Sequence, residues 1–155
     1  MADSDFRVIA TNRKARFEYE IGDRFEAGIA LKGTEIKSIR AGAVSLAEGY
    51  AALRNGELWL LDVHIAPYEQ AGRGSHDPRR SRKLLLHRRE LGKIRKATQE
   101  RGFTIVPLRM YLKGHFAKVE IGLAKGKRQY DKRRAIADRD TQRRVDRELK
   151  EYKRG

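Results

Sequence analysis

Apolar and polar residues alternate in several short stretches of the chain, which is the pattern of half-buried strands. Phe17–Ile21 and Phe25–Leu31 predict two strands that pair with each other. Phe103–Leu112 and Phe116–Leu123 predict two more strands, joined near Lys113-Gly114. The pattern therefore predicts a strand-rich core.

The clearest local signal is Asn55-Gly56, because Asn-Gly is the preferred centre of a type I′ hairpin turn. It lies between two apolar-rich runs, Tyr50–Leu53 and Glu57–Leu61. We expect the second strand to continue through residues 63–68. The stretch 69–83 is rich in Gly and Arg and predicts a loop.

Two helices are expected between the strands. Gly33-Thr34 predicts the cap of a short helix over Glu35–Arg40. Residues from His87 to Arg101 predict a longer helix with apolar positions on one face, and Gly102 predicts its end.

These elements amount to five or six strands, one main helix and one short helix. They favour a mainly β fold with helices, a small closed barrel of the oligonucleotide-binding (OB) type over residues 13–124. Residues 1–12 are polar and predict a flexible N-terminus. Residues 125–155 hold 13 Lys or Arg against 6 Asp or Glu, with few apolar positions. They predict a basic C-terminal tail, disordered alone and helical against an anionic surface.

The net charge of +15 indicates an anionic partner. A membrane is not the expected partner, because apolar runs such as Leu58–Leu61 are far shorter than the ~20 residues that span a bilayer. The N-terminus lacks the apolar segment of a signal peptide. Without cysteine there is no thiolate metal site and no disulfide. We expect a cytoplasmic protein with no metal and no cofactor.

The chain has no catalytic constellation. Its histidines show no i, i+4 metal-ligand spacing, and no Walker lysine or nucleophile elbow occurs. Glu18 and Glu20 share one predicted strand face, which is compatible with paired carboxylates, but ordinary solvated charges are strongly favoured. We expect a binding protein rather than an enzyme.

Basic clusters are dispersed along the chain and are suited to neutralising phosphates. They are Arg13-Lys14-Ala15-Arg16, Arg79-Arg80-Ser81-Arg82-Lys83, and Lys125-Gly126-Lys127-Arg128 running into Lys132-Arg133-Arg134. Phe17, Tyr19 and Tyr130 lie among them, as base stacking requires. Any single cluster also fits a solvated basic surface over core aromatics. The whole set indicates RNA, with Arg79 and Arg80 as candidate contacts.

Several segments resemble the SmpB family in order and spacing. They are Asn12–Arg16, Phe25–Gly42, Asp77-Pro78 with Arg82–Leu86, Gly122–Lys127, and Tyr130–Arg133. The resemblance implies an OB-type barrel with a C-terminal tail that folds in the ribosome. It also implies the partner: transfer-messenger RNA, bound through its tRNA-like domain by a monomer and delivered to ribosomes stalled without a usable codon.

The resemblance also places six residues on the RNA-facing surface: Tyr19, Glu26, Tyr50, Leu85, His87 and Lys118. A carboxylate such as Glu26 acts in an RNA interface only by accepting hydrogen bonds, and an ordinary exposed charge is the alternative. Leu85 belongs to a run of three leucines of which at least one is expected in the core. His87 stands where other members carry Asn, which preserves a hydrogen-bonding role.

In the tail, the resemblance implies contacts with ribosomal RNA of the small subunit, in the vacant decoding centre and messenger channel. The matching residues are Gly126, Lys127, Arg128, Tyr130, Asp131, Lys132 and Arg133. Thr141 stands where some members carry a large aromatic residue, so stacking at that position is in doubt.

The alternative function is a generic single-strand RNA-binding or ribosome-associated OB barrel. Such a protein would carry stacking aromatics on one face and show little preference for folded RNA.

Overall fold

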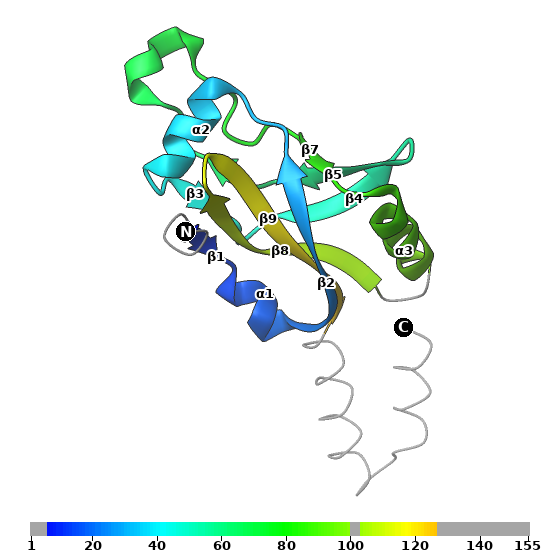
Figure 1. Cartoon of the computed structure of the whole chain (residues 1–155). Helices are drawn as coiled ribbons and strands as arrows, with labels where there is room; N and C mark the ends of the chain where they lie inside the picture. Colours follow the sequence, from blue (N-terminus) through cyan, green and yellow to red (C-terminus); the bar gives the residue numbers. More distant parts are fainter. Residues whose placement is uncertain (1–5, 100–102, 127–155) are drawn as a thin grey trace, which may run out of the picture.

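The computed structural model describes residues 6–99 and 103–126. Over these residues the chain forms strands, α-helices and a 3-10 helix (Figure 1). In chain order they are β1 (Phe6–Thr11), α1 (Arg13–Glu18), β2 (Tyr19–Ile29), α2 (Gly33–Arg40), β3 (Val44–Ser45), β4 (Tyr50–Arg54), β5 (Glu57–Leu61), β6 (His64–Ile65), η2 (Glu69–Gly74), β7 (Arg82–Leu85), α3 (Arg88–Thr98), β8 (Phe103–Lys113) and β9 (Phe116–Gly126).

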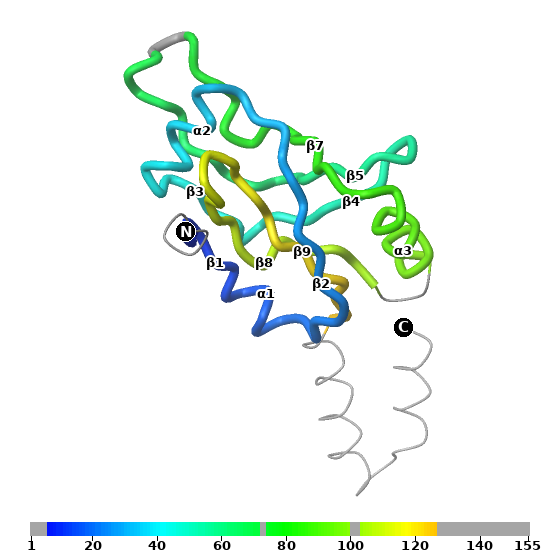
Figure 2. The backbone as a smooth tube through the Cα atoms, in the orientation of Figure 1, coloured from blue at the N-terminus to red at the C-terminus, as the bar shows by residue number. Residues whose placement is uncertain are grey.

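The main sheet closes on itself. Its strands follow the order β1-β8-β4-β5-β7-β2-β9, and β9 also pairs with β8. The β8–β9 pairing completes a ring of β8, β4, β5, β7, β2 and β9, which can be followed as a tube in Figure 2. The other edge of β8 is shared, since Ile105 pairs with β4 and residues 109–113 pair with β1. This closed, mainly β architecture confirms the predicted OB-type fold.

The core fills the inside of the ring. On each strand alternate residues point inward, as in Leu58 and Leu60 of β5 and in Val119 and Ile121 of β9, all fully buried. Burial of each such aliphatic side chain stabilises the fold by about 1.5–3 kcal/mol. The residues between them point outward, and α1 covers part of this outer face, where Ala15 packs with Val106, Leu108 and Ala124.

Both predicted hairpins are confirmed. Arg54 pairs with Glu57, so Asn55 and Gly56 form a two-residue turn, with φ of 53° and 77° as a type I′ turn requires. β8 and β9 are joined at Gly114, whose φ is 63°.

Both predicted helices are confirmed with shifted ends. α2 begins at Gly33, two residues before the predicted start at Glu35, because Glu35 accepts a hydrogen bond from the Lys32 backbone N–H at 2.7 Å. α3 begins at Arg88, and the His87 N–H donates to Glu90 at 3.3 Å in the same way. The predicted stop of this helix at Gly102 lies outside the described residues.

The prediction of a flexible N-terminus over residues 1–12 is wrong for residues 6–11, which form β1. Residues 6–11 pair with residues 109–113 of β8 and satisfy backbone N–H and C=O groups there that would otherwise lack partners. Ile9 and Ala10 also pack against the core. At the other end, β9 extends through Lys125 and Gly126, beyond the predicted barrel boundary.

The two strands predicted over residues 17–31 do not pair with each other. Asn12 Oδ1 accepts from the Ala15 N–H and caps α1, so Phe17 and Glu18 belong to that helix. Residues 19–29 then form one strand, β2, paired with β9. The Gly22-Asp23 dipeptide forms an irregularity within this strand instead of a turn.

Two further boundaries differ from prediction. β5 ends at Leu61, because Asp62 has φ 57° and redirects the chain. His64–Ile65 consequently forms β6, which pairs with β3 in a separate small sheet. Arg82 and Lys83, predicted in a loop, begin β7 because they pair with Leu60 and Trp59 of β5.

Candidate nucleic-acid interface

Five strands place one residue each in a row across the outer face of the barrel. The directly paired residues are Val8, Tyr111, Lys118, Gly28 and Leu85, on β1, β8, β9, β2 and β7. Directly paired residues of an antiparallel sheet point to the same face, with Cβ atoms about 4.5–5.5 Å apart. The row therefore brings together two predicted RNA-facing residues, Leu85 and Lys118.

Glu26 lies in the neighbouring row of the same face. It pairs with Glu120, which pairs with Arg109, two residues before Tyr111. We call this surface the outer patch. It consists of Val8, Gly28, Leu85, Glu26, Lys118, Glu120, Arg109, Tyr111 and Lys113.

Glu26 is held by two donors from β8. The Tyr111 hydroxyl donates to Glu26 Oε2, and Lys113 Nζ lies 3.6 Å from Glu26 Oε1. The Tyr111 hydrogen bond lowers the pKa of Glu26 against the opposing effect of burial, and Lys113 and Lys118 lower it further. Burial and the bond to Glu26 raise the pKa of Tyr111, so its proton stays in place. The side chain of Glu26 remains 42% exposed, so the ionised carboxylate has room to accept a ligand's hydrogen bonds.

A second carboxylate in the outer patch is engaged by arginine. Arg109 Nε lies 3.4 Å from Glu120 Oε1, and Arg24 Nη1 lies 3.8 Å from the same oxygen. Lys118, by contrast, makes no ion pair with another described residue. Its ammonium group is therefore available to a phosphate.

Leu85 is the outward member of the leucine run. Leu84 is buried and Leu86 is partly buried against the core, whereas Leu85 is 51% exposed. Gly28 beside it carries no side chain, and a Cβ there would lie 3.4 Å from the Cβ of Leu85. The surface between Leu85 and Lys118 is consequently flat, which allows close approach of a large ligand.

The other predicted contacts are dispersed. His87 is exposed just before α3, two residues beyond Leu85. Tyr19 is half-buried at the start of β2, where it pairs with Gly126, so it lies at the root of the tail rather than beside Glu26. Tyr50 is exposed on β4, three strands from β2 in either direction around the ring. The structure therefore assembles part of the predicted set and leaves these three apart from it.

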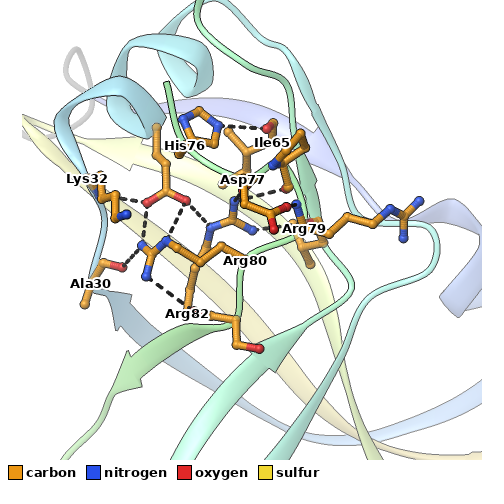
Figure 3. Close-up of polar contacts among 12 residues, drawn as sticks. Ala30, Lys32, Ile65, His76, Asp77, Arg79, Arg80 and Arg82 are labelled. Carbon is orange, nitrogen blue, oxygen red and sulfur yellow. Dashed lines mark hydrogen bonds and ion pairs between the residues drawn. The ribbon is translucent and has the colours of Figure 1, made fainter. Parts of the chain in front are cut away.

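Arg80 is engaged inside the protein, unlike its neighbour Arg79. Arg80 Nη2 lies 2.5 Å from Glu35 Oε1, and Arg82 Nε lies 2.5 Å from Glu35 Oε2. Figure 3 shows Arg80 and Arg82 converging, while the guanidinium of Arg79 points away from them. We call Glu35, Arg80 and Arg82 the Glu35 cluster.

Burial sets the electrostatics of the Glu35 cluster, because the side chains of Glu35 and Arg82 have no exposure. Burial raises the pKa of Glu35, but hydrogen bonds from Arg80, the Lys32 backbone and Arg82 outweigh it and bring the pKa below its ordinary value. Arg82 also donates to the carbonyls of Val63 and Pro78, at 2.9 and 3.1 Å. The cluster therefore links Glu35 on α2 to Arg80, in the segment before β7, and to Arg82, the first residue of β7.

Six members of the outer patch were missed by sequence reasoning: Val8, Gly28, Arg109, Tyr111, Lys113 and Glu120. Arg109, Tyr111 and Lys113 follow the period of two on a strand that was predicted correctly, and that period would have placed them on one face. No sequence signal places β1, and hence Val8, beside them.

The predicted tail contacts from Lys127 to Arg133 lie outside the described residues, as does Thr141, whereas Gly126 is the last residue of β9. Among residues 6–99 and 103–126 no group of His, Asp or Glu has the arrangement of a metal site. Within the same residues no helix is long and apolar enough to cross a membrane.

The closed ring of strands defines an OB-type barrel, a class whose members bind oligonucleotides on their surface. A family model described as "SmpB protein" matches residues 9–151. The chain belongs to this SmpB protein family.

Relatives and a solved structure agree with this assignment. An SsrA-binding protein of Roseiflexus castenholzii is 60% identical over 146 residues, covering 94% of this chain and 92% of the relative. One from Carboxydothermus hydrogenoformans is 54% identical over 144 residues, covering 93% and 97%. A structure described as "tmRNA-SmpB: a journey to the center of the bacterial ribosome" is similar with a TM-score of 0.68 and 47% identity, covering 88% of this chain and 95% of that one.

Proposed function

We propose that this chain is an RNA-binding protein of trans-translation. It binds transfer-messenger RNA and delivers it to stalled ribosomes in the cytoplasm. Membership of the SmpB family supports this role, as do relatives named SsrA-binding proteins and a structural neighbour described with tmRNA and the ribosome. The role is binding and delivery, without catalysis by this chain.

The observation that carries the proposal is the outer patch. It combines Lys118, which makes no ion pair with another described residue, an exposed leucine, Leu85, and a carboxylate, Glu26, that Tyr111 and Lys113 keep ionised and oriented. A basic surface alone would bind any polyanion. A fixed acceptor selects ligands with hydrogen-bond donors, such as base amino groups, so it adds discrimination.

The test is a competition assay between folded transfer-messenger RNA and an unstructured RNA of equal length, at fixed salt. We expect the folded RNA to displace the unstructured RNA at much lower concentration. Equal competition would support the generic single-strand binder and overturn this proposal.

The barrel and the tail have separate tasks in this proposal. The barrel holds the RNA, and residues 127–155 enter the vacant decoding centre and messenger channel. Their many Lys and Arg residues support contact with ribosomal RNA there. Truncation after Tyr130 is expected to keep most of the RNA affinity but to abolish alanine transfer on stalled ribosomes. Normal transfer by the truncated protein would refute the task assigned to the tail.

A further inference from the structure

Two exposed phenylalanines border the outer patch on the side of β1 and the β8–β9 hairpin. Lys113 pairs directly with Phe6 on β1 and with Phe116 on β9, so the three side chains form one more row on the same face. Phe116 is 71% exposed and Phe6 is 38% exposed. This row continues the surface that holds Glu26.

Phe6 is anchored by its neighbours. Its ring centroid lies 4.8 Å from that of Tyr111, and the Arg109 guanidinium lies 5.5 and 5.1 Å from the two centroids. Such cation–π and ring contacts hold the Phe6 ring in place. Phe116 has no ring contact with another described aromatic residue, so its face is open to a ligand.

The charges around the two rings favour RNA over an apolar protein surface. Lys113 lies between the rings, Lys118 follows Phe116 by two residues on the same strand, and neither lysine is buried. An aromatic face beside cations is the arrangement that binds an unpaired base by stacking and its phosphate by charge. We propose that Phe116 stacks on an unpaired base of the bound RNA, with Lys113 and Lys118 at the adjoining phosphates. This inference rests on the proposed function and adds a specific contact to it.

The first test separates stacking from simple apolar contact in the full chain. Phe116→Leu keeps an apolar side chain without an aromatic face, and Phe116→Trp keeps the face. We expect Phe116→Leu to bind transfer-messenger RNA roughly 5- to 100-fold more weakly and Phe116→Trp to bind like the wild type. The dependence of affinity on salt should stay unchanged in both, because no charge is lost.

A matched control makes the same aromatic-to-aliphatic change away from this face. Tyr68→Leu alters a half-buried ring that carries Lys37 at 5.2 Å, on the segment leading to η2. It should keep wild-type affinity, and thermal unfolding of all variants should show that they remain folded. If Phe116→Leu binds as tightly as the wild type, the stacking assignment is overturned.

A second test identifies the occupant directly. Phe116→p-benzoylphenylalanine is irradiated in complex with transfer-messenger RNA, alone and on stalled ribosomes. A crosslink to an unpaired nucleotide supports the assignment, and a crosslink only to protein overturns it.

Failure of this inference differs from failure of the proposed function. A wild-type protein that prefers folded transfer-messenger RNA, with a fully active Phe116→Leu variant, refutes stacking alone. A wild-type protein without that preference refutes the proposed function, and the affinity of Phe116→Leu for unstructured RNA then decides the stacking question.

Discussion

Two glutamates in this protein are each held by a pair of donors, and burial gives them opposite roles. Glu35 is fully buried and binds Arg80 and Arg82. Glu26 is 42% exposed and binds Tyr111 and Lys113. A buried carboxylate must have its oxygens satisfied inside the protein, since desolvation without partners costs several kcal/mol. An exposed one can keep acceptor positions for a ligand.

Three arginines close together in the sequence differ in how far they are available to bind RNA. Arg79, Arg80 and Arg82 are nearly adjacent in sequence, yet Arg82 is buried and Arg80 is ion-paired with Glu35. Of the three, Arg79 alone is exposed with its guanidinium free of the cluster, as Figure 3 shows. Basic residues that complete a buried ion pair are not fully available to phosphates.

The largest expected effect is loss of stability in the Glu35 cluster. Arg82→Met removes one partner of a fully buried carboxylate, so the free energy of unfolding should fall by about 3–5 kcal/mol. Chemical denaturation measures it. Arg79→Met is the matched control and should change stability little, because Arg79 is exposed. Equal stability of the two variants would mean that the cluster contributes nothing.

The second-largest expected effect is a loss of stability of the Glu35 cluster at acidic pH. The pKa of Glu35 is lowered in the fold, so its stabilising contribution is complete above the ordinary value of 4.5 and is lost as the pH falls through the folded value. Glu35→Gln imitates the protonated side chain. The difference in unfolding free energy between wild type and Glu35→Gln should therefore be largest near pH 7 and shrink below pH 4.5. A constant difference across this range would contradict the lowered pKa.

Much of the fold was predictable because local signals dictated it. Asn55-Gly56 allows little besides a type I′ turn, and alternation in β8 and β9 fixed both long strands. The predictions that were wrong concerned elements that form through contacts with distant parts of the chain. β1 forms because β8 offers an open edge, and α1 begins because the side chain of Asn12 caps it while its Nδ2 donates to the Pro107 carbonyl at 2.8 Å.

The candidate site was predicted only in part, because cross-strand register, which the sequence does not specify, determines which residues lie side by side. The family resemblance supplied Glu26, Leu85 and Lys118, which strand register brings onto one face. It did not supply Tyr111, because a residue's partner across strands follows from register and from the irregularity between Pro107 and Arg109. It also placed Tyr19 and Tyr50 on the RNA-facing surface; both lie outside the outer patch, and their contact with RNA stays a prediction.

A smaller effect is expected at the exposed carboxylate. Glu26→Lys raises the net positive charge, yet affinity for transfer-messenger RNA should fall by about 1–3 kcal/mol, because RNA donors lose their acceptor. Glu69→Lys makes the same charge change at an exposed residue of η2 and should bind no more weakly than the wild type. Tighter binding by folded Glu26→Lys would show that the outer patch recognises charge alone.

The different roles of Arg79 and Arg80 can be tested by measuring how RNA affinity depends on salt concentration. Arg79→Ala should flatten the slope of log affinity against log salt by about one unit, the effect of one lost phosphate contact. Arg80→Ala should mainly reduce stability, since it removes a partner of Glu35, and should leave the slope nearer to that of the wild type. If only Arg80→Ala changed the slope, these two roles would be reversed.

The smallest expected effect lies in the hydroxyl that orients Glu26. Tyr111→Phe retains the ring that packs against Phe6 and removes one hydrogen bond, so RNA affinity should fall by about 0.5–1.5 kcal/mol. Because that bond is the main cause of the lowered pKa of Glu26, this pKa should rise toward its ordinary value in the variant. NMR titration of the Glu26 carboxyl measures the pKa independently of binding. In Tyr111→Phe combined with Glu26→Gln, the tyrosine change should cost less than it does alone, since the hydroxyl acts through the carboxylate. An unchanged pKa of Glu26, or strictly additive losses of RNA affinity in the double variant, would mean that Tyr111 acts on RNA binding independently of Glu26.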